Sequence, residues 1–282
     1  MRTPVESANS SGRKRLPESW FRGRWNRDTV LAGLLPLATL LVVLVVWDRA
    51  IVYFHLPPEI IPRPLPSMEV LWEGLRSGVF ITHTWVTLQE VIYGFVLGGA
   101  AGFVCGVLIA EFPYVRMAVS PFLIVLQITP KVAIAPLFII WLGYGIQSKV
   151  AIAISISFFP IVINTIAGLR SVDGELLEMM NAFCATRWQT FYRVKLKMAQ
   201  PYIFAGLNVG MALAVIGAIV AEFVGSTKGL GYLILQANFK LDTEQVFALL
   251  VILAALGIAL DAILQFVSRR ALFWHDSERS KR

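Results

Sequence analysis

Long runs without a charged residue are the feature that most constrains this chain. Four intervals contain no Asp, Glu, Lys or Arg, and two longer runs contain one charged residue each. The four are 29–47, 91–110, 150–169 and 198–221, and the two are 117–148 and 245–268. A helix needs roughly 20 apolar residues to cross the hydrocarbon core of a bilayer. Because a helix satisfies its own backbone hydrogen bonds in lipid, the runs predict an all-α membrane protein.

Six transmembrane helices are predicted, within a membrane domain of residues 29–275. Their expected bounds are about 29–47, 84–110, 117–143, 148–170, 199–222 and 245–268. The 117–148 run is too long for one span and has Pro130 and Pro136 in its middle. We therefore expect a span broken into two helical pieces. Residues 1–28 form a basic tail, which is expected to be partly disordered, and residues 276–282 form a second tail.

Composition agrees with a membrane protein and excludes several other classes. The chain is 57% hydrophobic and 15% charged, whereas soluble domains are nearer to half apolar and a quarter charged. It has no GxxxxGK[ST] phosphate loop, no HExxH and no nucleophile elbow, so neither ATP binding nor catalysis is expected in this chain. The three histidines and two cysteines are too scattered to indicate a metal site or a disulfide framework.

The distribution of Lys and Arg predicts the orientation in the membrane. With six spans both termini lie on one side, and that side carries eighteen of these residues in its tails and loops, against six on the other. Positive residues gather in cytoplasmic loops. Both termini and the 174–197 loop are therefore expected in the cytoplasm of a bacterial cell, and the net charge of +7 needs no nucleic acid to explain it.

Small and polar residues inside the spans give two further predictions. Glycines recur every fourth residue in the second span, where they form one face that favours close helix packing, in this chain or with a second copy; they are Gly94, Gly98, Gly102 and Gly106. Charged and polar residues inside the membrane are candidates for a pathway or gate. They are Lys131, Asn164, Glu222 and Asp261.

Each of these polar candidates also has a structural interpretation. Lys131 either lines the pathway or bonds to carbonyl groups at a proline break, and Asp261 either has a functional role or only faces a polar neighbour. Asn164 lies four residues after Pro160 and is expected to bond to the carbonyl that this proline leaves free. Glu222 is expected at the outer end of its span, as is Glu90, where each would be an interfacial or gate residue that forms hydrogen bonds.

A charged segment, residues 174–197, interrupts the apolar runs. At 175–184 the apolar residues Leu176, Leu177, Met180, Phe183 and Cys184 have the spacing of one helix face. The polar residues Glu175, Glu178 and Asn181 lie on the opposite face. This pattern predicts an amphipathic cytoplasmic helix with Glu178 in its first turn. The periodicity alone leaves two possibilities open: the helix lies on lipid headgroups, or it docks a cytoplasmic partner.

The same segment resembles the coupling loop of the permease subunits of ABC importers. The matching residues are Leu176, Leu177, Glu178, Ala185, Arg187, Trp188, Leu196 and Pro201. Residues 130–145, 158–173 and 215–234 also resemble the branch of this family that handles nitrate, taurine, sulfonates and thiamine-precursor pyrimidines. The similarity covers roughly residues 60–275 and implies a type I ABC importer permease fold with cytoplasmic coupling helices.

The resemblance also implies the partners and their contact residues. A second permease copy would complete the pathway, two ABC ATPase subunits would bind ATP and Mg²⁺ in the cytoplasm, and an external binding protein would deliver a small solute. The residues implied in ATPase coupling are Glu178, Met179, Met180, Phe183, Cys184, Ala185, Arg187 and Trp188.

Four residues depart from the family's loop pattern, which has alanines at 179 and 180, glycine at 184 and proline at 197. They are Met179, Met180, Cys184 and Lys197. Since a glycine in such a turn often has a positive φ that cysteine resists, either the turn is reshaped or glycine is not needed there. Another class, an ion-coupled secondary transporter that uses Lys131 and Asp261, is the alternative function.

Overall fold

The computed structural model describes residues 19–272, apart from the side chains of residues 19–34 and 37. The predicted tail 276–282 and residues 1–18 of the other tail lie outside this range. Two units divide the chain after Leu56. The described part of the first contains α1 (Ser19–Phe54), and the second, from Pro57 onward, contains the remaining described helices. The predicted span 29–47 falls within α1, and residues 19–28, which we expected in the tail, are helical.

The described residues of the second unit form helices joined by short turns and loops, without a strand. Its helices are α2 (Pro64–Arg76), α3 (Val79–Glu111), α4 (Pro113–Ile128), α5 (Lys131–Leu142), α6 (Ile146–Arg170), α7 (Gly174–Ala182), α8 (Arg187–Thr190), α9 (Leu196–Gly225), α10 (Leu230–Phe239) and α11 (Thr243–Ala271). A π-helical turn, Phe191–Lys195, joins α8 to α9.

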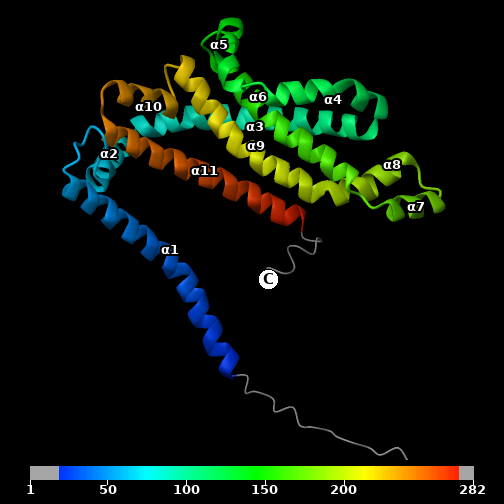
Figure 1. The fold of residues 1–282 in the computed structure, drawn as a ribbon, viewed down its shortest axis with the longest axis horizontal. Coiled ribbons are helices and arrows are strands. Elements are labelled where there is room, and N and C mark those ends of the chain that lie inside the picture. The colour runs from blue at the N-terminus through cyan, green and yellow to red at the C-terminus, as the bar shows by residue number, and fades with distance from the viewer. Residues whose placement is uncertain (1–18, 273–282) are drawn as a thin grey trace, which may run out of the picture. The chain divides into compact units, whose positions relative to one another are not determined.

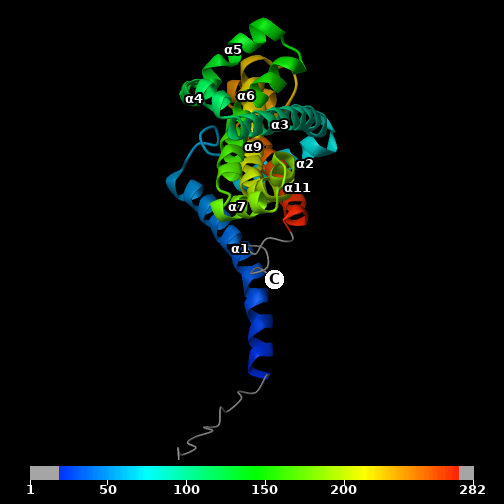
Figure 2. The same cartoon turned by 90° about the vertical axis from the view of Figure 1, so that its right-hand side faces the viewer.

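Within the described residues, four helical runs are long and apolar enough to cross a membrane. They are α3, α6, the continuous run Arg187–Gly225 and α11. A fifth is the pair α4 and α5, if it crosses as one broken span. These two helices meet at 97° (Figures 1 and 2). The bend follows from the sequence, because the residue before a proline avoids helical geometry and Thr129, before Pro130, has ψ of 129°.

The fifth predicted span begins differently from our expectation. We placed Pro201 near the first turn of a new helix at about residue 199. In the structure Pro201 lies inside α9, and the helical run extends back to Arg187 through the π-helical turn. A π turn accommodates one extra residue without ending a helix, so the loop and the span form one element.

Helix α6 lies at the centre of this unit, packed between α3 and α9. The four-residue glycine stripe of α3 lies directly on α6 of the same chain. A Cβ atom added to Gly102 would lie 2.9 Å from the carbonyl oxygen of Phe158, and one added to Gly106 would lie 2.7 Å from Cβ of Thr165. In lipid, such close backbone approach drives helix association, because apolar side chains gain little by leaving the lipid tails.

Glycines on α9 meet the other side of α6. A Cβ atom at Gly206 would lie 2.7 Å from Cβ of Asn164, and one at Gly217 would lie 2.9 Å from Cα of Ala153. Helix α6 is therefore held by glycine contacts on two sides. The elements that flank α9 lie at opposite ends of it. Helices α7 and α8 precede one end of α9, and α10 follows the other end (Figure 1).

Candidate functional site

Helix α7 begins the charged loop and has a defined amino-terminal cap. The carboxylate of Asp173 accepts a hydrogen bond of 3.1 Å from the backbone N–H of Glu175, which is an orphan donor at a helix start. Leu176, Leu177 and Met180 are half-buried, as the predicted apolar face requires. Glu178 is exposed, but it lies in the second turn, and Glu175 is the acid of the first turn.

The apolar face of α7 is shorter than the sequence pattern predicted. The helix ends at Ala182, so Phe183 and Cys184 turn away from the face and are exposed. Phe183 is 75% exposed and Met179 is 45% exposed. The loop thus presents two large apolar side chains to its surroundings beside the Glu178 carboxylate.

Cys184 occupies the turn where the related loops have glycine. Its φ is +52°, in the left-handed region that L-residues disfavour by about 1–2 kcal/mol. Two backbone bonds close the turn: the N–H of Cys184 donates to Asn181 at 2.9 Å, and the N–H of Ala185 donates to Met180 at 3.0 Å. These are the bonds of a Schellman motif, in which glycine is the usual left-handed residue. The turn is therefore not reshaped, and cysteine adopts the strained conformation.

Helix α8 carries the second aromatic group of the loop. Thr186 and Gln189 form a reciprocal capping box, with the Gln189 N–H donating to Thr186 Oγ1 at 3.3 Å and the Thr186 N–H donating to Gln189 Oε1 at 2.9 Å. The Trp188 ring, 72% exposed, stacks on Phe191 and Tyr192 with ring centroids 5.8 and 6.4 Å apart. The exposed Arg187 precedes this aromatic cluster, and Ala185 lies half-buried before it.

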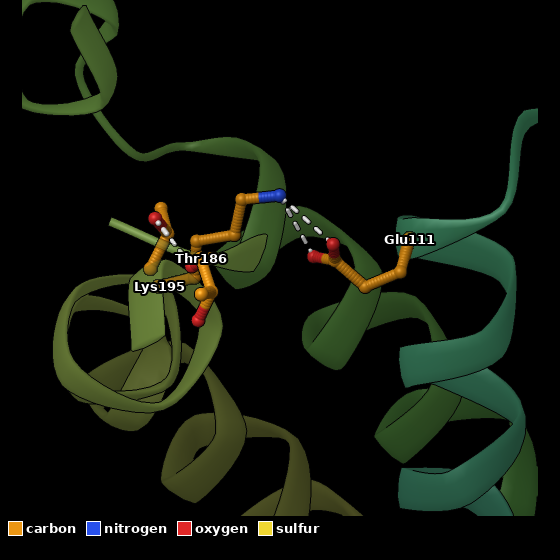
Figure 3. A network of polar contacts seen from close by, with 4 residues as sticks. Glu111, Thr186 and Lys195 are labelled. Carbon is orange, nitrogen blue, oxygen red and sulfur yellow. Dashed lines mark hydrogen bonds and ion pairs between the residues drawn. The ribbon is translucent and has the colours of Figure 1, made fainter. Parts of the chain in front are cut away.

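An ion pair ties the loop to the end of α3. The Lys195 ammonium donates to both carboxylate oxygens of Glu111 at 2.9 Å, and both side chains are about three-quarters buried (Figure 3). Lys195 lies in the π-helical turn, and Glu111 is the last residue of α3. Sequence analysis missed this pair, because no local pattern joins residues 84 positions apart.

Glu222, which we predicted to form hydrogen bonds as an interfacial or gate residue, lies in a hydrogen-bond network that is buried inside the protein. Its carboxylate is 1% exposed and accepts hydrogen bonds from Thr87 Oγ1 at 2.6 Å and from the backbone N–H groups of Gly231 and Tyr232. Glu90 is 2% exposed, and α3 continues eleven residues before it, to Val79. Both acids are buried because α10 folds back over this end of α3 and α9.

The surroundings of these two acids contain residues that the sequence did not single out. Lys149 on α6 is 3% exposed, interacts electrostatically with both carboxylates and donates to the carbonyl oxygens of Tyr144 and Gly145. The Gly229 N–H donates to His83 Nδ1 at 3.0 Å, and the His83 ring stacks on Tyr232. A cleft of about 360 Å³ opens here between α3 and α10. Lys149 resembled a loop charge in the sequence because it directly precedes a charge-free run.

The remaining pathway candidates have local partners. Lys131 Nζ donates to the Gln127 carbonyl at 3.1 Å across the α4–α5 break and lies 4.4 Å from the Phe159 ring centroid. Asp261 is exposed and accepts from Gln265 Nε2, one turn along α11, at 2.7 Å.

The hydrogen-bond acceptor of Asn164 differs from the one that we predicted. Its side-chain amide donates to the carbonyl of Pro160 itself at 2.8 Å, whereas the carbonyl that a proline frees is four residues earlier, at Ile156. Among the described residues, the four pathway candidates form no hydrogen bond with one another, and no group of three His, Cys, Asp or Glu side chains could hold a metal ion.

Comparison with known proteins assigns the chain to a family. Residues 98–272 match the family described as the binding-protein-dependent transport system inner membrane component. The riboflavin transport system permease protein RibX of Chloroflexus aurantiacus is 37% identical over 85% of this chain and 89% of that protein. The formylaminopyrimidine transport permease protein ThiX of Halalkalibacterium halodurans is 33% identical over 87% and 98%.

A further relative and a solved structure agree with this assignment. The putative aliphatic sulfonates transport permease protein SsuC of Bacillus subtilis is 30% identical over 94% of this chain and 91% of that protein. A chain of the inward-facing MetNI methionine ABC transporter shares the fold, with a TM-score of 0.62 and 18% identity over 70% of this chain and 97% of that one. The chain therefore belongs to the binding-protein-dependent transport system inner membrane component family, as a multi-pass permease component of an ABC importer in the inner membrane.

Proposed function

We propose that the 174–197 loop of this permease docks an ABC ATPase subunit in the cytoplasm. The observation that carries the proposal is the exposure of Met179, Phe183 and Trp188 on one loop, beside the charged Glu178 and Arg187. Aromatic residues, methionine and arginine are enriched at protein interfaces. In this proposal ATP and Mg²⁺ are bound by the ATPase partner, and this chain is not catalytic.

The stable local structure of the loop supports docking on a protein rather than loose contact with lipid. Caps fix the start of α7 and of α8, the turn at Cys184 is closed by two backbone bonds, and Lys195 is paired with Glu111. A rigid apolar projection loses little conformational entropy when a partner covers it. The exposed side chains are therefore presented in a fixed arrangement, as a docking surface requires.

The family supports a proposal for the assembly and for the cargo. We propose that two copies of this chain form the pathway, that both termini lie in the cytoplasm, and that an external binding protein delivers the solute. The relatives are named for riboflavin, a formylaminopyrimidine and aliphatic sulfonates, which supports a small heterocyclic or sulfonated solute. The sequence alone suggests nitrate, sulfonates and pyrimidines as possible solutes. The relative named for riboflavin adds a larger heterocyclic compound to these classes of solute.

Charge substitutions on the exposed side chains test the docking surface. We expect Met179→Asp combined with Phe183→Asp to release the ATPase, because each acid would have to be desolvated in the interface. Both side chains are exposed, so the variant should insert and fold normally. Met180, which is half-buried, is less suitable, because a charge there would disturb α7 itself.

The measurement is recovery of the ATPase with affinity-tagged permease purified from membranes. The matched control is Met179→Leu combined with Phe183→Leu, which keeps apolar side chains and should retain the ATPase. If the aspartate variant retained the ATPase at normal permease levels, the loop would not be the docking surface.

A further inference from the structure

Helices α3 and α9 are joined by side-chain contacts near both of their ends. At one end Thr87 on α3 donates to Glu222 on α9 at 2.6 Å. At the other end Glu111, the last residue of α3, is paired with Lys195 in the turn that leads into α9, at 2.9 Å. At a rise of 1.5 Å per residue the two contacts lie roughly 35–40 Å apart along the helices. They are called here the Glu222 contact and the Glu111–Lys195 contact.

The Glu222 contact also holds the start of α10. The first amide groups of a helix have no partner within it. Here the carboxylate of Glu222 accepts from the N–H groups of Gly231 and Tyr232, and Thr87 Oγ1 accepts from the N–H of Leu230 at 2.8 Å. The backbone N–H groups of Gly231 and Tyr232 would lose their acceptor if the Glu222 carboxylate were removed. Because Glu222 is buried, this loss would be costly. The amino end of α10 is thus fixed to both α3 and α9.

The Glu111–Lys195 contact holds the other end of the same helix pair. The helical run Arg187–Gly225 is continuous, so Trp188, Lys195 and Glu222 all belong to one element. A displacement of α8 must therefore move α9. The two side-chain contacts would carry that movement to α3 and α10, because packed helices shift as units between discrete arrangements.

We propose that the Glu222 and Glu111–Lys195 contacts make α3 and α9 one rigid lever, which couples the α10 end of the permease to the 174–197 loop. The inference rests on the proposed function, in which the ATPase docks on that loop. Glu222, Glu111 and Lys195 are then positioning residues. Their role is to hold the helices together, so that binding-protein contact at one end stays linked to ATP hydrolysis at the other.

A double-mutant cycle in the reconstituted complex tests the lever. The quantity measured is the ratio of binding-protein-stimulated to basal ATP hydrolysis. Glu222→Met and Lys195→Met should each lower this ratio about fivefold, the effect of losing one buried hydrogen-bonded contact. A lever that is released at one end no longer transmits movement to the other end. The ratio of the double variant should therefore be no lower than that of the more affected single variant.

Independent contacts give a different result. Substitutions this far apart are normally additive, so two unrelated defects would lower the ratio by the product of the single effects, about 25-fold. Such additivity, or single variants with a normal ratio, would overturn the proposal. An additive result with the ATPase still bound would leave the docking function intact, whereas loss of docking is detected separately by ATPase recovery.

Conservative variants serve as controls and keep the test decisive if Glu222→Met fails to assemble. Glu222→Gln retains an acceptor for the α10 amides and should keep the ratio close to normal. Lys195→Glu alone should lower the ratio, and adding Glu111→Lys should restore it by re-forming the ion pair with reversed charges. Failure of the reversed pair to restore stimulation, in a complex that contains normal amounts of ATPase, would contradict the lever.

Discussion

At the scale of single residues, the loop contains one position where sequence and backbone conformation conflict. Cys184 has φ of +52° in a Schellman turn. We expect Cys184→Gly to stabilise the permease by about 1 kcal/mol, because glycine adopts this conformation without a Cβ penalty. The measurement is the thermal unfolding midpoint of the purified complex. Cys184→Ala is the matched control and should give no such gain, since it retains the Cβ; a gain with alanine would show that the thiol, not the backbone, is responsible.

Lys131 gives a second prediction at this scale. Its ammonium bonds to Gln127 across the α4–α5 break and lies over the Phe159 ring. These contacts favour the structural interpretation and are together worth about 1–2 kcal/mol. Lys131→Ala should lower the unfolding midpoint of the complex, and Lys131→Arg, which keeps a cation and a donor, should restore it. An alanine variant with unchanged stability and lost uptake would place Lys131 in the pathway instead.

At the scale of helices, the glycine stripe of α3 determines how closely α6 can approach. Gly102→Ala would place Cβ 2.9 Å from the Phe158 carbonyl oxygen and 3.1 Å from Cβ of Ile161. We expect a loss of about 1–3 kcal/mol, the usual effect of overpacking a close contact. Gly257→Ala is the control: no atom outside its own stretch of α11 lies within 4 Å of the added Cβ, and alanine favours a helix by about 1 kcal/mol. Equal unfolding midpoints for the two variants, measured on purified permease, would contradict this packing.

The sequence predicts the helices better than it predicts the contacts between them. Charge-free runs located α3, α6 and α11 within a few residues at most ends, because exclusion of charge from lipid is a local property. Glycine spacing indicated a packing face, but only the structure shows that α6 of the same chain occupies it. The π-helical turn escaped detection, since Trp188, Phe191 and Tyr192 fit ordinary helical spacing as well.

The candidate site shows the same division between local and long-range information. The half-buried apolar residues Leu176, Leu177 and Met180 follow from local amphipathic spacing, whereas Phe183 is exposed because α7 ends at Ala182. The network around Glu222 depends on Thr87 and on the amides of residues 231 and 232, which approach it only when α3, α9 and α10 pack together. A carboxylate at the end of an apolar run is equally consistent with an interface and with burial, so the sequence could not separate them.

At the scale of the whole molecule, the loop and α10 lie at opposite ends of α9 (Figure 1). In the assembly that we propose, this separation would place the ATPase contact at one end of the permease and the binding-protein contact at the other. Phe183 in the loop and Phe239 at the end of α10 are both highly exposed, at 75% and 81%. The two positions are therefore well matched for an experiment that finds which end of the permease the ATPase contacts.

Site-specific photo-crosslinking at these two positions tests the central claim most directly. A photoreactive phenylalanine analogue at position 183 should form a covalent adduct with the ATPase subunit in assembled complexes, and the same analogue at position 239 should form none. Adducts of the ATPase with position 239, or their absence at position 183 in complexes that contain the ATPase, would contradict the account.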